Sequence, residues 1–366
     1  MFNDYYLGKT VLVTGHTGFK GSWLTLWLLR LGARVIGVSN SIPTTPSHFL
    51  ELGLEKRITH YFCDVRNELQ ISAIIASERP DFVFHLAAQA IVSQSYVNPL
   101  ETITTNAIGT AVVMDALRKA ERPIAAVLIT SDKAYENVEQ IWGYREIDAL
   151  GGKDVYSGSK GAAELIIKCF LHSFFTDPDG PVRVAVARAG NVIGGGDWAS
   201  DRIVVDCVRA WSAGAKAEIR RPRATRPWQH VLEPLAGYLH LGAELANRPD
   251  LHREAFNFGP PAEQVYPVVE LLEGLARIWG FEKPKDSYFV SGSAHYHEAT
   301  LLKLNCDKAL QRLQWRATLT YEETLAFTGQ WYKKFYSDVA AAEDITAEQI
   351  EEYETLATSR GLVWTG

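Results

Sequence analysis

The 366-residue sequence predicts an α/β fold in which a doubly wound parallel sheet carries a smaller, discontinuous α+β lobe. Short apolar strands alternate with helical stretches up to Asn191, and a glycine-rich turn follows the first strand. Beyond Asn191 the alternation decays. Continuous apolar strands separated by helices are typical of a parallel sheet that is buried on both faces.

The first strand is expected at Thr10–Thr14, an apolar run that enters the glycine turn 15–21. A Trp- and Leu-rich helical stretch follows the turn and ends at Leu31. Further strands are expected at 34–38, 59–63, 81–85, 125–130, 182–187 and 255–258, and further helices at 68–78, 99–119, 156–175 and 231–247. Open sheets built in this order bind ligands at the carboxyl ends of their strands.

The change of pattern after Asn191 predicts two domains. Residues 1–191 and 230–259 form the sheet domain, and residues 192–229 and 260–366 form the smaller lobe. The first lobe segment contains a cluster of four arginines with two prolines, between Arg220 and Trp228. The acidic, Ala-rich stretch 340–356 has helical spacing and is interpreted as a solvated helix at the rim or as a dimer contact.

Composition and charge limit the classes of function. The net charge is −6 and the pI is about 6.0, so the positive surface expected of a nucleic-acid binder is missing. The four cysteines show no paired short spacing, and His295-Tyr296-His297-Glu298 has no further ligand cluster nearby, so neither a disulfide framework nor a metal is expected. The start lacks a basic leader, and the most apolar run, Trp23–Leu31, is too short to span a bilayer. We expect a cytoplasmic protein with no membrane segment.

The glycine turn has the spacing of a dinucleotide fingerprint. Gly15, Gly18 and Gly21 lie between a strand and a helix, where glycine permits a tight turn and close approach of the backbone to a pyrophosphate. The helix N-terminus attracts the phosphate charge. His16 and Lys20 flank these glycines and either contact phosphate or point into solvent. The sequence therefore predicts a bound dinucleotide.

Later strand ends supply the other expected cofactor contacts. Residues 38–41 contain neither the acid that usually binds the adenosine ribose nor an arginine for a 2′-phosphate, so NAD and NADP are not distinguished here. Asp64 follows the third strand, where it either binds the adenine amine or caps the next helix. Small residues after His85 leave room for a dinucleotide, and His85 itself is expected in the core. The expected cofactor contacts are Gly15, His16, Gly18, Phe19, Lys20, Gly21, Asp64, Val65, Ala87, Ala88, Gln89, Asn106, Tyr156 and Lys160.

Reactive side chains cluster at the end of the fifth strand and on the helix that follows. Ser131-Asp132-Lys133 places a hydroxyl, a carboxylate and an amine in succession, and Tyr156 and Lys160 share one helical face at i, i+4. An ammonium beside the phenol is expected to lower the phenol pKa below about 10. Such a phenol takes a proton from a sugar or alcohol hydroxyl while a hydride leaves the same carbon. A turn or helix cap is the alternative role of the Ser-Asp pair.

Several motifs resemble the nucleotide-sugar branch of the extended short-chain dehydrogenase/reductase family. They are the Thr14–Gly21 turn, His85-Leu86-Ala87-Ala88 and Tyr156-x-x-x-Lys160. Longer motifs resemble the CDP-glucose 4,6-dehydratases within this family and extend over nearly the whole chain. These are Thr130–Asn137, Trp142–Glu146, Leu150–Gly152, Gly194–Trp198, Arg226–Pro234 and Gln349–Tyr353. The resemblance implies a Rossmann fold, NAD as the cofactor and a lyase activity on a nucleotide sugar.

In the mechanism that this resemblance implies, Tyr156 accepts the proton of the hydroxyl on sugar carbon 4 as its hydride passes to NAD+, with Ser131 and Lys160 assisting. Asp132 matches the general acid that protonates the departing hydroxyl of carbon 6, which requires a carboxyl whose pKa is raised by desolvation. The hydride then returns to carbon 6. CDP-D-glucose would become CDP-4-dehydro-6-deoxy-D-glucose and feed deoxysugar and lipopolysaccharide O-antigen synthesis.

Lys133 departs from the wider dehydratase group, in which a glutamate usually follows the aspartate as the base at carbon 5. A lysine is a base only when it is neutral, which requires a lowered pKa. The alternative is that Lys133 stays charged and stabilises the enolate while another group moves the proton. Ala134 stands where these enzymes often have Cys, and we expect this difference to be harmless.

The same motif matching implies that Asn191 and Arg202 face the nucleotide sugar and that Arg226 binds its diphosphate. The missing acid after the second strand implies weaker retention of NAD+ than in relatives that have it. Helices 99–119 and 156–175 resemble the pair that forms a four-helix dimer contact in this family. A homodimer is therefore expected, with a tetramer as the alternative.

Three other functions remain open from the sequence. A dehydratase of GDP-mannose or dTDP-glucose shares these motifs, because the smaller lobe selects the base. A nucleotide-sugar 4-epimerase shares Tyr156 and Lys160 but has no use for Asp132 and Lys133 as an elimination pair. A non-catalytic dinucleotide sensor commonly lacks the Tyr or the Lys that this chain retains.

Overall fold

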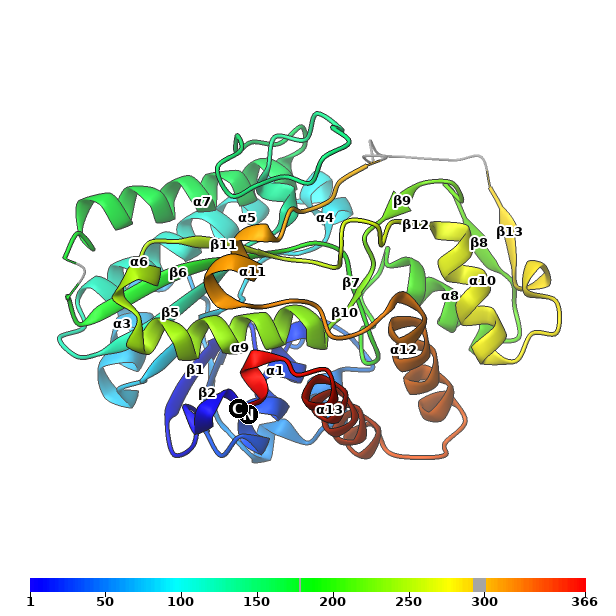
Figure 1. Ribbon diagram of the computed structural model, residues 1–366, viewed down its shortest axis with the longest axis horizontal. Coiled ribbons are helices and arrows are strands. Elements are labelled where there is room, and N and C mark those ends of the chain that lie inside the picture. The colour runs from blue at the N-terminus through cyan, green and yellow to red at the C-terminus, as the bar shows by residue number, and fades with distance from the viewer. Residues whose placement is uncertain (178, 292–300) are drawn as a thin grey trace.

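The computed structural model describes residues 1–177, 179–291 and 301–366. Seven parallel strands form one sheet in the order β11-β6-β5-β4-β1-β2-β3 (Figure 1). The strands are β1 (Thr10–Thr14), β2 (Arg34–Ser39), β3 (Thr59–Phe62), β4 (Phe82–His85), β5 (Ile124–Ile129), β6 (Val182–Ala189) and β11 (Ala255–Phe258). The chain direction across the sheet reverses between β1 and β4, which is the ligand-binding switch point of a doubly wound Rossmann sheet. The predicted fold class is confirmed.

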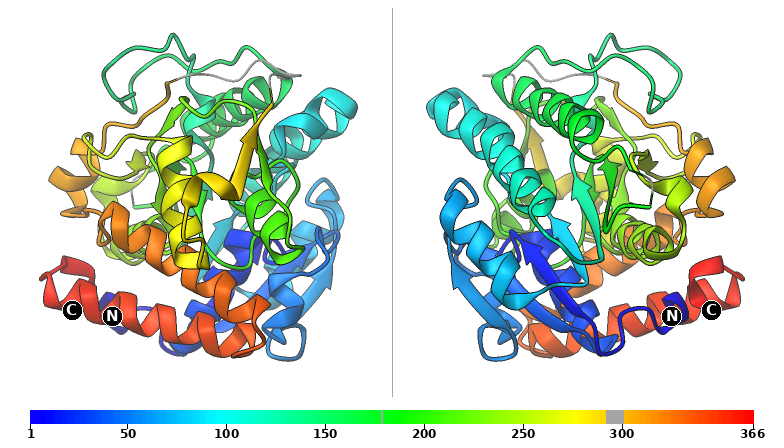
Figure 2. Two further views of the ribbon diagram at one scale, coloured as in Figure 1. Left: turned by 90° about the vertical axis from the view of Figure 1, so that its right-hand side faces the viewer. Right: turned by 90° about the vertical axis from the view of Figure 1, so that its left-hand side faces the viewer.

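Two apolar cores cover the two faces of this sheet. Val11 and Val13 of β1 belong to one core, while Leu12 belongs to the other, as the alternation of strand side chains requires. The first core includes α1 (Phe19–Arg30) and α9 (Leu232–Asn247), and the second includes α3 (Glu68–Glu78), α6 (Gly109–Arg118) and α7 (Val155–Ser173). Figure 2 shows these helices on opposite sides of the sheet.

The expected elements of the sheet domain are present with small shifts at their ends. The predicted helix 99–119 is divided into α5 (Pro99–Ile103), a π-helical turn (Thr104–Ile108) and α6. The long helix α7 begins after Asp154, whose side chain accepts a hydrogen bond from the Ser157 amide and so caps the helix. His85 lies in the core as predicted, with its ring nitrogens 2.7 and 3.2 Å from the hydroxyls of Thr14 and Thr110.

The smaller lobe is built by pairing between distant segments. Strand β8 (Ala217–Ile219) pairs with β13 (Tyr288–Val290), and β9 (Thr225–Arg226) pairs with β12 (Tyr266–Pro267). Helix α8 (Ile203–Ser212) contacts β8, helix α10 (Val268–Trp279) contacts β12, and helix α12 (Tyr321–Tyr336) packs against α10 (Figure 1). Segments on either side of α9 and β11 therefore meet in this lobe, which is the discontinuity that the change of pattern predicts.

The C-terminal helix α13 (Ala342–Ser359) lies against the sheet domain. The Trp27 ring of α1 packs edge-on against Tyr353, and its indole nitrogen donates to Glu354 at 2.8 Å. The two chain ends lie side by side, with the Asn3 amide donating to the Gly366 oxygen at 2.7 Å (Figure 2). The predicted helix in 340–356 is confirmed. The domain boundaries stay a prediction, and the last part of the chain also covers α1.

The remaining elements are short, and the longest of them is the seven-residue helix α11 (Asp307–Leu313). The others are α2 (His48–Glu51), α4 (Val92–Val97), β7 (Val192–Ile193), β10 (Gln229–His230) and 3-10 turns at Phe2–Asp4, Leu54–Lys56, Asp132–Ala134, Pro249–Leu251, Pro284–Ser287 and Val363–Thr365. Among the described residues, no helix combines the length and the apolar composition needed to cross a bilayer.

Candidate active site

The glycine turn lies over the carboxyl end of β1 and against the chain that leaves β4. Gly15 has a φ of +75°, and a Cβ there would lie 2.8 Å from the Ala87 amide nitrogen. At Gly21 a Cβ would lie 2.2 Å from the Gly15 carbonyl oxygen, so glycine allows α1 to begin directly beside the turn. Among the described residues, a Cβ on Gly18 would have the Gly15 oxygen alone within 4 Å. The turn is thus a backbone cradle at a helix N-terminus, with open space that suits a pyrophosphate.

The His16 side chain is buried beneath this cradle. Its ring packs against Phe49 and His60, with centroids 5.1 and 4.5 Å away, and a Cβ on Gly37 would lie 2.5 Å from it. Burial, followed by the charge of His60, lowers the His16 pKa to about 3. His16 is therefore a neutral core residue, so the expectation that it points into solvent is wrong. A contact of its ring with phosphate would require the ring to leave this packing, and a contact of its backbone stays a prediction.

Lys20 also turns inward. Its ammonium donates to the Tyr238 hydroxyl of α9 at 3.4 Å. Burial, followed by the charge of Arg202, lowers the Lys20 pKa to about 7, while the charge of Asp132 opposes the shift. Lys20 therefore belongs electrostatically to the catalytic cluster, a placement that the sequence did not reveal.

Asp64 is held by Arg66. The guanidinium lies 2.9 Å from Oδ1 and 2.7 Å from Oδ2, and the Asn40 amide donates to Oδ2 at 3.2 Å. Hydrogen bonding by Arg66 lowers the Asp64 pKa to about 2. Asn67 caps α3 by accepting a bond from the Gln70 amide, so the alternative in which Asp64 caps this helix is wrong. The adenine contact of Asp64 stays a prediction.

Asn106 links the loop after β4 to α7. Its side chain accepts from the Gln89 amide at 2.8 Å and donates to the Gln89 carbonyl at 3.1 Å and to the Ser159 hydroxyl at 2.8 Å. Ser159 donates in turn to the Tyr156 carbonyl at 2.7 Å. Asn106 lies in the π-helical turn, and such turns are frequent at functional sites. It holds the Gln89 backbone against the first turns of α7.

Ser131, Asp132 and Lys133 lie at the carboxyl end of β5, where the strand gives way to the 3-10 turn Asp132–Ala134. The Ser131 side chain caps this turn by accepting from the Lys133 amide at 3.2 Å, and its hydroxyl donates to Asp132 Oδ1 at 3.0 Å. The cap role is therefore present. It also fixes the hydroxyl beside the carboxyl, so it is compatible with catalysis.

The Asp132 carboxyl is 3% exposed, and Oδ2 has no hydrogen-bond partner within the described part of the chain. Burial raises the Asp132 pKa, and this outweighs the opposing charges of Lys133, Lys20 and Arg226. A Cβ on Gly190 would lie 3.0 Å from Oδ2, so glycine at this position leaves room for the carboxyl. The raised pKa that a general acid requires is present.

Tyr156 and Lys160 lie on α7, and each is 7% exposed. Burial raises the Tyr156 pKa to about 12, against the opposing charge of Arg202 and hydrogen bond of Ser131. The expectation of a lowered phenol pKa is wrong for this structure, because loss of hydration outweighs the nearby positive charge. Burial also lowers the Lys160 pKa to about 8, while Glu164 opposes that shift.

The predicted substrate residues lie where the smaller lobe meets the sheet. Arg202 precedes α8, and its charge acts on Tyr156. Arg226 of β9 is 7% exposed, and its charge acts on Asp132. Asn191 is half-buried between β6 and β7. Two arginines therefore place positive charge beside the catalytic cluster, as an anionic substrate requires.

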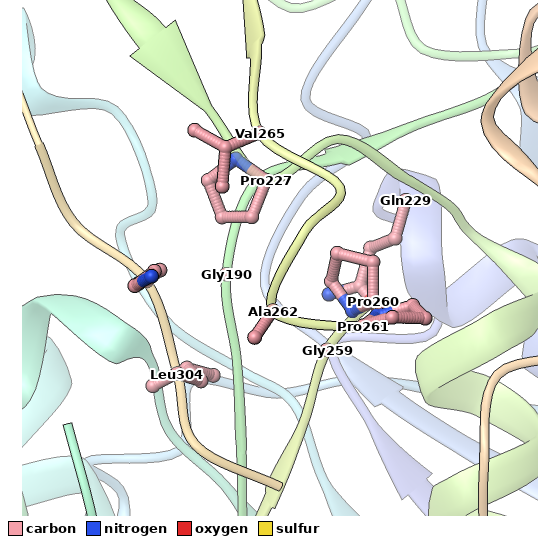
Figure 3. A pocket seen from close by; sticks show the side chains of 10 residues that line it. Gly190, Pro227, Gln229, Gly259, Pro260, Pro261, Ala262, Val265 and Leu304 are labelled. Carbon is pink, nitrogen blue, oxygen red and sulfur yellow. The ribbon is translucent and has the colours of Figure 1, made fainter. Parts of the chain in front are cut away.

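A small hollow reaches this cluster at Gly190, and a larger hollow adjoins the small one. The smaller hollow, about 10 Å³, has Pro260 beside Gln229 and Val265 beside Pro227 (Figure 3). It is lined by Gly190, Pro227, Gln229, Gly259, Pro260, Pro261, Ala262, Val265, Lys303 and Leu304. The larger hollow, about 430 Å³, shares Ala262 and Lys303 with it and adds Gln140, Trp142, Gly143, Arg145, Asp148 and Asn305. Its volume lies in the range of ligand pockets, about 300–1,000 Å³.

Within residues 1–177, 179–291 and 301–366, no group of three His, Cys, Asp or Glu side chains could hold a metal ion. The sequence His295–Glu298 lies outside the described residues. The sequence did not predict three neighbours of the cluster. These are Gly190 beside Asp132, Tyr238 beside Lys20, and Glu164 beside Lys160. Only Glu164 carried a signal, its i, i+4 spacing from Lys160.

Comparisons with known proteins agree with this geometry. The family model described as GDP-mannose 4,6 dehydratase matches residues 12–234. The CDP-glucose 4,6-dehydratase of Salmonella typhimurium is 42% identical over 333 residues, covering 90% of this chain and 92% of that protein.

Two solved structures share the fold. A UDP-glucose 4-epimerase of Thermotoga maritima with UDP-glucose superposes with a TM-score of 0.75 at 23% identity, over 89% of this chain and 99% of that chain. A dTDP-glucose 4,6-dehydratase of Streptomyces venezuelae with NAD bound gives a TM-score of 0.75 at 20% identity, over 89% and 97% of the two chains. With the family model matched over residues 12–234 and a relative at 42% identity, the chain belongs to the nucleotide-sugar dehydratase family that the GDP-mannose 4,6-dehydratase model describes.

Proposed function

We propose that this chain is an NAD-dependent CDP-glucose 4,6-dehydratase, a hydro-lyase that converts CDP-D-glucose to CDP-4-dehydro-6-deoxy-D-glucose. The observation that carries the proposal is Asp132, a buried carboxyl of raised pKa directly beside the hydroxyl of Ser131 and near Tyr156. Oxidation alone needs the phenol, whereas elimination of water also needs an acid. The name of the relative at 42% identity supports CDP-glucose as the substrate.

The glycine cradle fits a dinucleotide. Gly15, Gly18 and Gly21 would hold the pyrophosphate at the N-terminus of α1, with Phe19 and Lys20 beside it, and Asp64 and Val65 would lie at the adenine end. Ala87, Ala88 and Gln89 would border the other half. NAD+ supplies the hydride acceptor and donor when it is bound.

The first proton transfer belongs to Tyr156. With a pKa of about 12, the phenol is protonated at neutral pH in this structure, so it must first lose its own proton to solvent. The phenolate then accepts the proton of the carbon 4 hydroxyl and becomes a phenol again. Lys160 lies one helical turn away, and the charge of Arg202 favours the phenolate. The Ser131 hydroxyl orients the same sugar oxygen.

The elimination belongs to Asp132 and Lys133. The ketone at carbon 4 acidifies the proton on carbon 5. Lys133 either removes that proton as a neutral amine, or stabilises the enolate as an ammonium while another group removes the proton. Asp132 gives its proton to the departing hydroxyl of carbon 6, which leaves as water, and Asp132 ends as a carboxylate. Arg226 and Arg202 would bind the diphosphate and the sugar, and Asn191 would contribute a hydrogen bond.

A substrate panel tests this proposal. We expect protein incubated with NAD+ and CDP-glucose to form a 4-keto sugar, detected by its alkali-induced ultraviolet absorbance, with little from UDP-, dTDP- or GDP-hexoses. Tyr156→Phe serves as the inactive control. Product from dTDP-glucose or GDP-mannose alone would reassign the substrate. A 4-epimer without keto sugar would make the chain an epimerase, and the absence of any product would favour a dinucleotide sensor.

We further propose a cytoplasmic homodimer, with a tetramer as the alternative, that serves deoxysugar and O-antigen synthesis. The support is a set of exposed apolar side chains on the helices expected to form the dimer contact, namely Leu100, Ile103, Ile108 and Leu165. Light scattering of the purified protein measures the oligomeric state. Leu100→Glu together with Ile108→Glu should yield monomers.

A further inference from the structure

A buried ion pair lies directly behind the catalytic cluster. Glu164 follows Lys160 by one turn of α7 and is 3% exposed, as is Arg188 of β6. The guanidinium forms two parallel bonds with the carboxylate, 2.7 Å from Nε to Oε1 and 2.8 Å from Nη2 to Oε2. Such bidentate pairs fix relative orientation as well as distance. The pair therefore fixes α7 to β6 at the level of Lys160.

The same pair holds both ends of the segment that carries Ser131, Asp132 and Lys133. The Thr130 hydroxyl, directly before this segment, donates to Glu164 Oε1. Tyr135 lies two residues after Lys133, and its hydroxyl accepts a bond from Arg188 Nη1 at 2.7 Å. One ion pair thus connects the end of β5, the turn after it, and the helix that carries Tyr156 and Lys160.

The negative charge of Glu164 stabilises the positive charge of Lys160. Two titratable groups of other elements act on Lys160 or are acted on by it. They are His85 of β4, a neutral ring whose pKa is about 3, and Lys20 of the glycine turn, a like charge. Glu164 opposes the effect of burial on the Lys160 pKa. An ammonium at this position thus depends on the neighbouring carboxylate.

We propose that Glu164, held by Arg188, is a positioning residue that fixes the Ser131–Lys133 segment relative to Tyr156 and keeps Lys160 in its ammonium form. The inference rests on the proposed function, because the groups that it positions are the ones assigned to the reaction. Glu164 acts through Thr130 and Lys160 and does not itself contact the reacting sugar.

Two variants separate positioning from folding. Glu164→Gln leaves the Arg188 charge buried with a poorer partner, so it should lose both stability and activity. Glu164→Met combined with Arg188→Met removes both charges, and replacing a buried pair by apolar side chains of similar size is often neutral or stabilising. We expect this double variant to recover the thermal midpoint of the wild type. Its kcat should stay about 10- to 100-fold lower, with KM little changed, because the reacting groups are less well placed.

The pH profile adds a readout that packing alone would not move. Without the carboxylate, the Lys160 pKa falls further, so the alkaline limb of kcat/KM should shift to lower pH in the double variant. Glu233→Gln is the matched control, since Glu233 is a buried carboxylate on α9. It should lower stability and leave the pH profile unchanged.

An NMR titration of the lysines needs no substrate. The protein is labelled with 13C at the lysine ε-carbons, and the Lys160 signal is assigned by its loss in Lys160→Arg. A wild type that converts no nucleotide hexose refutes the proposed function, and this titration still tests the ion pair. The expected result is a lower titration midpoint for Lys160 in the double variant. Either an unchanged midpoint or a wild-type kcat in the folded double variant overturns the inference.

Discussion

Asp132 and Glu233 are both buried acids with raised pKa values, but their surroundings differ. Glu233 accepts bonds from the amides of residues 318–319, at 2.8 and 2.6 Å, and from the Tyr353 hydroxyl at 3.0 Å. Within the described ranges, the Asp132 side chain accepts one side-chain hydrogen bond, from Ser131, and its Oδ2 has no partner. Native proteins pair nearly all buried polar atoms, so an unpaired one points to a function that needs it free.

The two regions also differ in what they connect. Glu233 ties the start of α9 to α13 and to the chain that leads into α12, three elements of one packed core. Asp132 lies at a strand end, where Lys20, Lys133 and Arg226 gather around it. The first acid contributes to stability, and the second lies beside a hydroxyl with its pKa raised by burial. Each substitution below tests this contrast.

The largest expected effect is that of Asp132→Asn. An amide cannot give up the proton that the leaving hydroxyl needs, so kcat should fall by about 10²- to 10⁴-fold. The pKa of Asp132 is raised on folding, so the carboxyl contributes least to stability above that pKa, and a neutral amide should not lower the thermal midpoint at pH 7.5. Keto-sugar assays and thermal unfolding measure both. A kcat within threefold of the wild type would contradict the assignment of Asp132.

Gly190→Ala should act through the same carboxyl. The new Cβ would lie 3.0 Å from Asp132 Oδ2 and must displace it by a few tenths of an ångström. We expect kcat to fall about 10- to 100-fold, because misplacement of a reacting group by up to an ångström costs that much. In the double variant with Asp132→Asn, Gly190→Ala should lower kcat no further, because the carboxyl on which it acts has been removed. Additive losses in the double variant would place the effect elsewhere.

Glu233→Gln should have the opposite effect to Asp132→Asn, with kcat unchanged and a lower stability. The free energy of unfolding should fall by about 1–3 kcal/mol, because an amide NH₂ would face backbone N–H donors. Burial raises the Glu233 pKa to about 7, from an ordinary value of 4.5. The contribution of Glu233 to stability is therefore complete below pH 4.5 and is lost as pH rises through 7. The variant should lack this part of the pH dependence. Thermal midpoints at pH 5 and pH 8 measure the difference.

The contrast between these acids also marks the limit of sequence analysis. Strand periodicity and the glycine spacing predicted the sheet, and the succession Ser131-Asp132-Lys133 with Tyr156 predicted the cluster. Whether an acid is satisfied depends on partners that are distant in the chain, such as Tyr353 for Glu233, 120 positions away. The Tyr156 pKa was mispredicted for the same reason. The sequence showed Lys160 one helical turn away, but it showed neither the burial that raises the pKa nor the charge of the distant Arg202 that opposes the rise.

The smallest expected effect is that of Tyr353→Phe, which removes one donor from Glu233 and leaves two. The Tyr353 hydroxyl also accepts a bond from Thr318 Oγ1 at 2.9 Å, so the loss should lower the free energy of unfolding by about 0.5–1.5 kcal/mol, with no change in kcat. Because the Tyr353 bond favours the charged carboxylate, its removal raises the Glu233 pKa further and moves the loss of stability to higher pH. In a double-mutant cycle with Glu233→Gln, this shift with pH should vanish. A shift that persists in the cycle would mean that Tyr353 acts on another group, and the contrast with Asp132 would then rest on the two backbone amides alone.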